Sequence, residues 1–279
     1  MKSWYLKCIF TLKYNKLKKA ELDSTVYIKE LEEKIVDLSL RLKNRTKEHN
    51  LVLEKNKKII GKLVHNLKNP IGIAFSFSDM ILEDIDDYSI DKLRKHVQII
   101  KNSAEFSIQL LNAIAKFTQL RSPDFIYNFK KIDYIELVNN VLNEFNSTAE
   151  KKSIIIERNF SDIPIFLMGD RDKISLAIRN IINNSLRYSR DNSTIKISVK
   201  ENLESVNTSI TDEGVGISES DLPNIFKEFY IVNTYSEDKQ KCIGLGLSIA
   251  NEIIQHHKGK ISVTSSINKG TNVETMFPK

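Results

Sequence analysis

GKLVHNLKNPIGI, residues 61–73, places one histidine in a polar gap between two apolar helical runs. Leu63 and Leu67 lie four residues apart on one helix face, so the spacing predicts a helix that turns His65 towards solvent. Pro70 removes a backbone donor and is expected to bend this helix. A neutral imidazole is a usable nitrogen nucleophile. Taken alone, the segment fits an ordinary exposed histidine as well as it fits a chemical site.

Upstream of this segment, apolar residues repeat by threes and fours through residues 28–63, a heptad pattern that predicts a coiled coil. Arg45 and His49 fall on the seam, so His49 is better explained as a polar seam residue than as a chemical group. The same helix runs on to His65. We therefore expect residues 1–56 to form a basic, helical or coiled-coil segment that is mechanically continuous with the histidine.

Downstream, the apolar pattern continues to an acidic turn at residues 83–87, and a second amphipathic helix covers residues 90–117. A hairpin of two such helices cannot bury both apolar stripes by itself. Pairing of two hairpins into a four-helix bundle would bury them, so a homodimer is implied. We place this dimerisation hairpin at residues 57–121, ahead of a breaker segment at 121–124.

From residue 125 to residue 279 the pattern changes to shorter elements. The sequence predicts a helix at 133–152, a strand at 153–158, a helix at 170–189, a hairpin of strands 194–200 and 205–211, a helix at 245–257, and closing strands at 260–265 and 272–277. Helices beside a mainly antiparallel sheet make an α+β sandwich, so the fold class is multidomain. His256 and His257 end the last of these helices and are expected to interact with its dipole.

Charge and cysteine content limit the classes of partner. The net charge of +6 belongs to residues 1–60, which carry +7, whereas the remainder carries −1. A solvated helix explains this excess better than an acidic partner or a membrane surface, and no direct nucleic-acid binding is indicated. Cys8 and Cys242 cannot form a disulfide framework, which fits a reducing, cytoplasmic location. Lysines interrupt the apolar opening of the chain well short of the roughly 18 residues that a membrane span needs.

The helix AIRNIINNSLRYS carries asparagines where packing alone would favour apolar residues. Asn180 and Asn184 are four residues apart and share one face, with Arg187 and Tyr188 about one turn further on. Asparagine is disfavoured in a helix interior, so this cluster, with Asn183, requires an explanation. Its amide oxygens are suitable ligands for Mg²⁺ that also binds phosphates.

Two glycine-containing segments follow. In DEGVGI, residues 212–217, the glycines let the backbone approach a flat ligand, and the Asp212 carboxylate is suited to accept a hydrogen bond from an exocyclic amine. In IGLGLS, residues 243–248, two glycines open a helix whose N-terminal amides would face phosphate oxygens. Each segment alone is a weak signal, but the order and spacing of all the clusters together are strong.

Over about residues 57–279 the chain resembles the transmitter of a two-component sensor histidine kinase. HNLKNP resembles the phosphoacceptor box of this family and NIINNSLRYS its asparagine box. DEGVGI and GLGLS resemble its two glycine boxes, and IFKEFY, residues 225–230, its phenylalanine box. The resemblance implies a dimeric helical hairpin followed, at residues 125–279, by an ATP-binding sandwich of the GHKL or Bergerat type.

The resemblance also implies ATP and Mg²⁺ as cofactors and gives residues their roles. His65 would receive the γ-phosphoryl group and pass it to an aspartate on a response regulator receiver domain, and Asn69 would support dephosphorylation of that partner. Asn184 would coordinate Mg²⁺, and Asp212 would bind the adenine amine. Residues 226–243 would form a mobile lid. The other residues expected around the nucleotide are Asn180, Arg187, Tyr188, Gly214, Gly216, Ile217, Phe226, Gly244, Leu245, Gly246 and Leu247.

Three residues depart from the family pattern. Asn66 stands where an acidic residue usually follows the histidine, and its side chain accepts a hydrogen bond but cannot take a proton. Cys242 replaces a glycine ahead of GLGL, and Glu228 replaces a residue that is often basic. We expect an active autokinase, and the alternative is a nucleotide-binding dimeric signalling scaffold with weak or absent kinase activity. A chaperone-type or mismatch-repair-type ATPase is disfavoured because the asparagine helix lacks a catalytic carboxylate.

Overall fold

A computed structural model of the chain describes all residues except 1, 86–87, 123, 161 and 233–241. For residues 2–28, 30, 52 and 55 it describes the backbone but not the side chain. Parts of the predicted acidic turn, breaker segment and lid therefore lie outside the described residues, as does the side chain of Cys8. The chain divides into two compact units, Met1–Gly61 and Lys62–Lys279.

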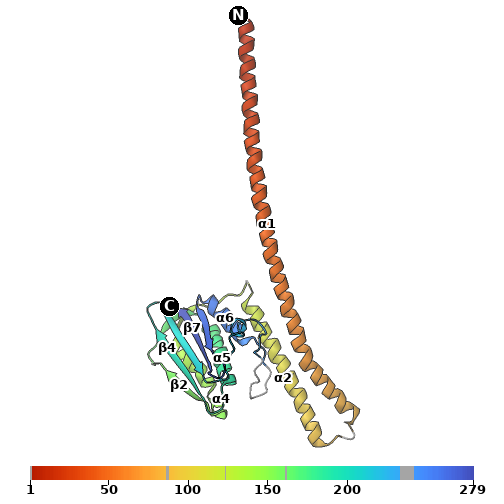
Figure 1. Cartoon of the computed structure of the whole chain (residues 1–279), viewed down its shortest axis with the longest axis vertical. Helices are drawn as coiled ribbons and strands as arrows, with labels where there is room; N and C mark the ends of the chain where they lie inside the picture. The colour runs from red at the N-terminus through yellow and green to blue at the C-terminus, as the bar shows by residue number, and fades with distance from the viewer. Residues whose placement is uncertain (1, 86–87, 123, 161, 233–241) are drawn as a thin grey trace. The chain divides into compact units, whose positions relative to one another are not determined.

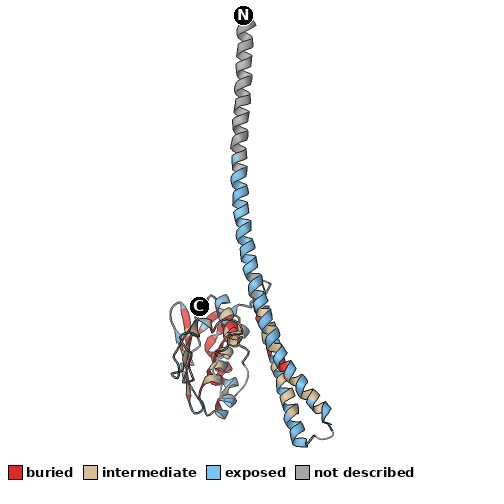
Figure 2. Ribbon diagram, turned by 45° about the vertical axis from the view of Figure 1, so that its right-hand side comes forward, coloured by how far each residue is buried: buried red, intermediate tan, exposed pale blue. Residues whose placement is uncertain are grey.

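The first unit is helical throughout its described part and belongs to α1 (Lys2–Glu83). Its described side chains are exposed, apart from half-buried Ile59. Seam residues such as Ile35 and Leu42 are 64% and 68% exposed, so the apolar seam is uncovered in a single chain (Figure 2). Among the described residues, no helix is long and apolar enough to cross a membrane.

The second unit begins with the helical hairpin. The helix α1 passes through Pro70 as far as Glu83 without a break, and Pro70 itself is buried. The helix α2 (Ile90–Leu120) begins after Ser89, whose hydroxyl oxygen accepts a hydrogen bond from the Lys92 amide at 3.3 Å. A serine in this position satisfies an otherwise unpaired amide of the first turn. The predicted start of the second helix at residue 90 is confirmed.

The remainder of the second unit is a two-layer sandwich (Figure 1). Its main sheet has five strands in the order β2-β4-β5-β7-β6. These strands are β2 (Ile155–Asn159), β4 (Thr194–Glu201), β5 (Ser205–Asp212), β6 (Lys260–Ser265) and β7 (Thr271–Pro278). The helices are α3 (Tyr134–Glu144), α4 (Asn146–Lys151), α5 (Arg171–Tyr188) and α6 (Gly246–His256), with a 3-10 turn at Leu222–Asn224.

Alternation along the strands decides which face of the sheet is buried. Ile210 of β5 lies between Ile197 of β4 and Val273 of β7 in register, and all three side chains are buried. The neighbouring Ser209 and Asn272 point to the other face, where they hydrogen-bond to each other at 2.7 Å. Apolar side chains therefore cover one face only, and the buried residues concentrate between that face and the helices (Figure 2).

The predicted α+β sandwich is confirmed, with two corrections of detail. The short strands β1 (Lys130–Asp133) and β3 (Phe166–Gly169), which form a separate antiparallel pair, were not predicted. The helix expected over residues 133–152 is two helices, divided at Phe145. The strand β2 pairs with β4 in a parallel direction and the other pairs of the main sheet are antiparallel, so the prediction of a mainly antiparallel sheet is confirmed.

His257 ends α6 as expected, where it is the C-cap, but its ring is not an exposed charged group. Its ring is buried, with Nε2 accepting a hydrogen bond from the Asp170 amide at 3.0 Å and Nδ1 lying 2.7 Å from the Ile253 carbonyl oxygen. Burial lowers the pKa of His257, which favours the neutral ring. The Nδ1–H therefore donates to Ile253, and His257 joins α6 to the start of α5 as a neutral imidazole.

Candidate functional site

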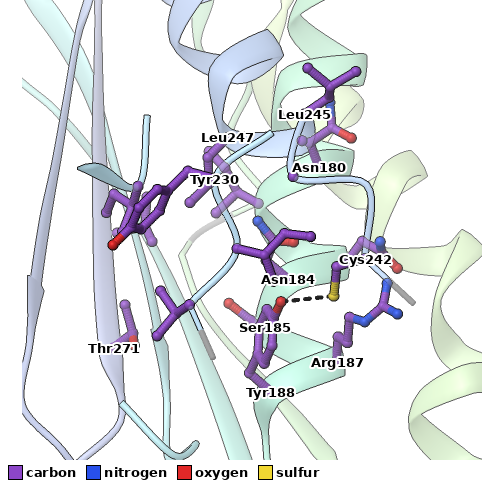
Figure 3. A pocket seen from close by; sticks show the side chains of 18 of the residues that line it. Asn180, Asn184, Ser185, Arg187, Tyr188, Tyr230, Cys242, Leu245, Leu247 and Thr271 are labelled. Atoms are coloured by element: carbon purple, nitrogen blue, oxygen red, sulfur yellow. Dashed lines mark hydrogen bonds between the residues drawn. The ribbon is translucent and has the colours of Figure 1, made fainter. Parts of the chain in front are cut away.

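A cavity of about 290 Å³ opens between α5, the turn after β5 and the segment that leads into α6 (Figure 3). The described residues that line it include most of those predicted to surround a nucleotide. They are Asn180, Asn184, Arg187, Tyr188, Asp212, Gly216, Ile217, Gly244, Leu245, Gly246 and Leu247. Gly214 and Phe226, which were also predicted, do not line this cavity.

The helix α5 forms the polar wall of the cavity. Its N-cap Asp170 accepts from the Lys173 amide, and its apolar face, including Ile178 and Ile181, is fully buried. This packing turns Asn180 and Asn184 towards the cavity. Among the described residues the buried Nδ2 of Asn180 has no hydrogen-bond partner. A buried amide without a partner is costly, so this wall is suited to a polar ligand.

The Asp212 carboxylate lies at the floor of the cavity and is held in one orientation. Its Oδ1 accepts hydrogen bonds from the Gly214 amide at 2.9 Å and the Thr271 amide at 3.1 Å. Burial raises the pKa of Asp212, and hydrogen bonds from these amides and from the Ser185 side chain oppose the shift. A carboxylate fixed in this way presents a directed acceptor to a ligand in the cavity.

The glycines around the cavity serve different purposes. Gly216 and Gly244 both have φ of +73°, and a Cβ on Gly216 would lie 2.0 Å from the Ser266 carbonyl oxygen. Gly214 has no room for a side chain, because a Cβ would lie 2.4 Å from the Tyr188 carbonyl oxygen. By contrast, a Cβ on Gly246 would make only ordinary contacts, the nearest at 3.7 Å from Asn180 Oδ1. The protein fold therefore does not require a glycine at position 246.

Two tyrosines complete the lining. The Tyr188 hydroxyl lies 3.0 Å from Cys242 Sγ, and burial, followed by this contact, raises the pKa of Tyr188 (Figure 3). Tyr230 donates to Asp221 Oδ1 at 2.5 Å, and this hydrogen bond raises the pKa of Tyr230. Cys242, which departs from the family's glycine, thus occupies the cavity wall beside Tyr188.

His65 lies on α1, exposed as predicted, with Asn69 exposed on the same helix face one turn later. Asn66 is half-buried. Adjacent residues on a helix project about 100° apart, and in the described structure Asn66 makes no hydrogen bond to His65. The structure does not bring these three residues into the lining of the cavity.

Two contributors to the site were missed at the sequence level. Ser185 is buried on α5 and hydrogen-bonds to Asp212, and Thr271 both lines the cavity and donates its amide to the same carboxylate. The asparagine-rich pattern around Ser185 offered a signal that was not used. Thr271 is 59 residues from Asp212 in the sequence, and only the pairing of β5 with β7 brings them together.

Comparison with known proteins agrees with this geometry. Residues 169–279 match the family described as "Histidine kinase-, DNA gyrase B-, and HSP90-like ATPase". The chain is 29% identical over 227 residues to sensor histidine kinase WalK of Bacillus subtilis, covering 81% of this chain and 37% of that protein. It is 25% identical over 234 residues to sensor protein kinase WalK of Staphylococcus aureus, covering 83% of this chain and 55% of that protein. The chain thus spans about a third to a half of these curated relatives.

Solved structures share the fold. Histidine kinase ThkA, in its complex with response regulator protein TrrA, matches with a TM-score of 0.68 at 22% identity, covering 82% of this chain and 64% of that chain. Acinetobacter baumannii histidine kinase AdeS matches with a TM-score of 0.59 at 20% identity, covering 77% and 97% respectively. The chain is therefore similar to sensor histidine kinases: residues 169–279 match the ATPase family model, and a helical hairpin that carries His65 lies ahead of them.

Proposed function

We propose that the chain is an ATP-dependent protein-histidine kinase that phosphorylates itself on His65 and passes the phosphoryl group to an aspartate of a response regulator receiver domain. The cavity is the observation that supports this most directly: it gathers Asn180, Asn184 and Asp212 beside two glycine turns. The similarity to sensor histidine kinases supports the exposed His65 as the acceptor. The complex of ThkA with a response regulator supports the choice of partner.

The nucleotide would lie between α5 and the turns that follow β5 and precede α6. Asp212, oriented by two backbone amides, would accept a hydrogen bond from the adenine amine. The first amides of α6 would face the phosphates. The amide oxygen of Asn184 suits Mg²⁺. The Nδ2 of Asn180, which has no hydrogen-bond partner among the described residues, supports a polar ligand at this wall. When bound, the metal ion would neutralise negative charge on the phosphates.

The proposed reaction places few covalent demands on the protein. A ring nitrogen of His65 forms a bond to the γ-phosphorus while the bond from that phosphorus to the bridging oxygen of ADP breaks. The proton on the other ring nitrogen then passes to solvent, which leaves a neutral phosphoramidate ring. Such a transfer depends mainly on positioning and on charge stabilisation. Asn66 supplies no carboxylate beside the ring, so we expect this step to be slow. Asn69, on the same face as His65, is the proposed support for regulator dephosphorylation.

We further propose that the hairpin, residues 57–121, dimerises into a four-helix bundle. In the single chain α2 buries Leu110 and Phe117 but leaves the stripe of Val97, Ile108 and Leu111 at least half exposed. On α1, Phe75 is 66% exposed. A second copy would cover these apolar side chains and extend the coiled coil through residues 1–56. The ATP-binding domain would occupy residues 125–279, and the kinase would act in the cytoplasm.

The test is incubation of the full chain with Mg²⁺ and ATP labelled on the γ-phosphate, followed by acid and alkali treatment of the labelled protein. We expect a label that is lost in acid and kept in alkali, as a phosphoramidate requires. A second candidate, favoured by Asn66, is a nucleotide-binding scaffold. That candidate predicts ATP binding in the same preparation without an acid-labile label.

A further inference from the structure

We infer that Arg121 is a positioning residue that holds the end of α2 against the turn leading into the nucleotide cavity. The inference rests on the proposed kinase function and adds a residue that the family pattern does not assign. Arg121 Nη1 lies 2.7 Å from Glu228 Oε1, and Arg121 Nε lies 3.6 Å from Glu252 Oε2. One guanidinium from the hairpin thus contacts carboxylates from two separate elements of the sandwich.

Arg121 is well placed for this task because it is the C-cap of α2. Its guanidinium carbon lies 5.1 Å from the centroid of the Phe117 ring, one turn earlier, which restricts the side chain. The Glu228 and Glu252 side chains are 28% and 23% exposed, so both carboxylates are partly withdrawn from solvent. The planar guanidinium offers separate donors to the two carboxylates, which a lysine would not reproduce.

Backbone contacts continue from Glu228 to the cavity. The next residue, Phe229, has φ of +57°, and its amide donates to the Gly244 carbonyl oxygen at 2.9 Å. Gly244 lines the cavity, and a Cβ there would lie 2.8 Å from the Tyr230 carbonyl oxygen. The backbone around Glu228 is therefore packed directly against the glycine turn, with little room for independent movement. A displacement of the backbone at Glu228 would therefore also displace Gly244 in the wall of the cavity.

Other contacts join the hairpin to the same region. Lys62 Nζ donates to the Glu228 carbonyl oxygen at 3.4 Å, and Lys62 is three residues before His65 on α1. Gln109 and Ala113 of α2 line the cavity. Both helices of the hairpin thus contact either the turn at Glu228 or the cavity itself. The ion pair between Arg121 and Glu228 lies at the end of this contact surface, where it would fix the orientation of the sandwich relative to the hairpin.

The acidic residue at position 228 is explained by this contact. A basic side chain at this position would repel Arg121, whereas the Glu228 carboxylate accepts a hydrogen bond from its guanidinium. Partly exposed ion pairs contribute little to stability, so loss of the pair should shift docking rather than unfold the protein. A typical pair of this kind is expected to change the docking equilibrium by about two- to fivefold.

The experiment is a double-mutant cycle on the full chain with Arg121→Gln, Glu228→Gln and the double variant. Hydrogen exchange of peptides covering residues 107–121 and 222–230 measures docking without any need for kinase activity. We expect each single substitution to speed exchange about two- to fivefold, and the double variant to exchange no faster than the faster single variant. The rate of phosphohistidine formation at saturating Mg-ATP should fall by a similar factor while the nucleotide Kd is unchanged.

The matched control is the cycle Arg179→Gln and Glu144→Gln, because that pair has the same 2.7 Å distance but lies within the sandwich. It should leave exchange of the two peptides and the rate unchanged. The inference would be overturned if hydrogen exchange were unchanged in the Arg121 variant, or if the effects of the two substitutions multiplied in the double variant. It would also be overturned if the rate of phosphohistidine formation were unaltered or increased. A wild-type chain that forms no phosphohistidine but shows the exchange coupling would instead contradict the proposed kinase function.

Discussion

The substitution Gly246→Ala tests whether Gly246 is required for nucleotide binding or for the stability of the fold. Gly246 is the first residue of α6, and an alanine Cβ would meet Asn180 atoms at 3.7 to 3.8 Å, an ordinary contact distance. Replacing a helical glycine with alanine stabilises by at most about 0.5–1 kcal/mol. In a protein of this size that corresponds to a rise in Tm of up to about 2–4 °C.

Nucleotide binding should respond in the opposite direction. The same methyl group would enter the space that the phosphates need at the start of α6, and overfilling a packed site costs about 1–3 kcal/mol. Mg-ATP should therefore bind roughly 5- to 150-fold more weakly by isothermal titration calorimetry. The control is Gly216→Ala, where φ of +73° and the 2.0 Å approach to Ser266 require a loss of Tm. A Gly246→Ala protein that is destabilised, or that binds Mg-ATP normally, would refute this reasoning.

Three further predictions concern the cavity, the histidine and the buried ring of His257. Asn184→Ala should weaken ATP binding about tenfold in Mg²⁺ and much less in EDTA, because it removes a proposed metal-ligand oxygen. Calorimetry under both conditions measures this difference. Equal losses of ATP affinity would contradict a role of Asn184 in metal binding. Asn66→Asp and Asn66→Glu should speed phosphohistidine formation with ATP affinity unaltered, and unchanged or lower initial rates for both would place the base elsewhere. Because the pKa of His257 is lowered, the unfolded chain binds a proton that the native ring resists, so stability present above pH about 6.5 is lost as pH falls. In urea unfolding, the free energy of unfolding should fall less between pH 7.5 and pH 5.5 in His257→Gln than in the unsubstituted protein. An equal fall in both proteins would show that other groups cause the pH dependence.

Sequence periodicity predicted the long helices well because each carries one continuous apolar stripe. The helix α5 matches its predicted range closely, since its apolar face and its asparagine face have the same helical period. The strands β4 and β5 were also predicted, because alternation and a polar turn mark a hairpin locally. The local sequence pattern of such elements predicts them without any knowledge of distant residues.

Features that depend on distant partners were not predictable in this way. The strand β1 has four residues and includes Lys130 and Lys131, so it shows almost no alternation, and it exists by pairing with β3. The buried contact of His257 is with Asp170, 87 residues away, and no local pattern distinguishes a buried histidine at a helix end from an exposed one. The ion pair of Arg121 with Glu228 likewise joins residues 107 positions apart. Glu228 was noticed only as a departure from a family pattern.

The most direct measurement is to locate the phosphoryl group after incubation of the full chain with Mg-ATP. Mass spectrometry under alkaline conditions should find it on His65, and His65→Gln should remove all acid-labile label while nucleotide affinity and dimerisation stay unchanged. The matched control, His49→Gln on the same exposed helix, should label normally. Acid-labile label that persists in His65→Gln, or a phosphoryl group found on another histidine, would contradict the proposal that the HNLKNP segment is the phosphoacceptor.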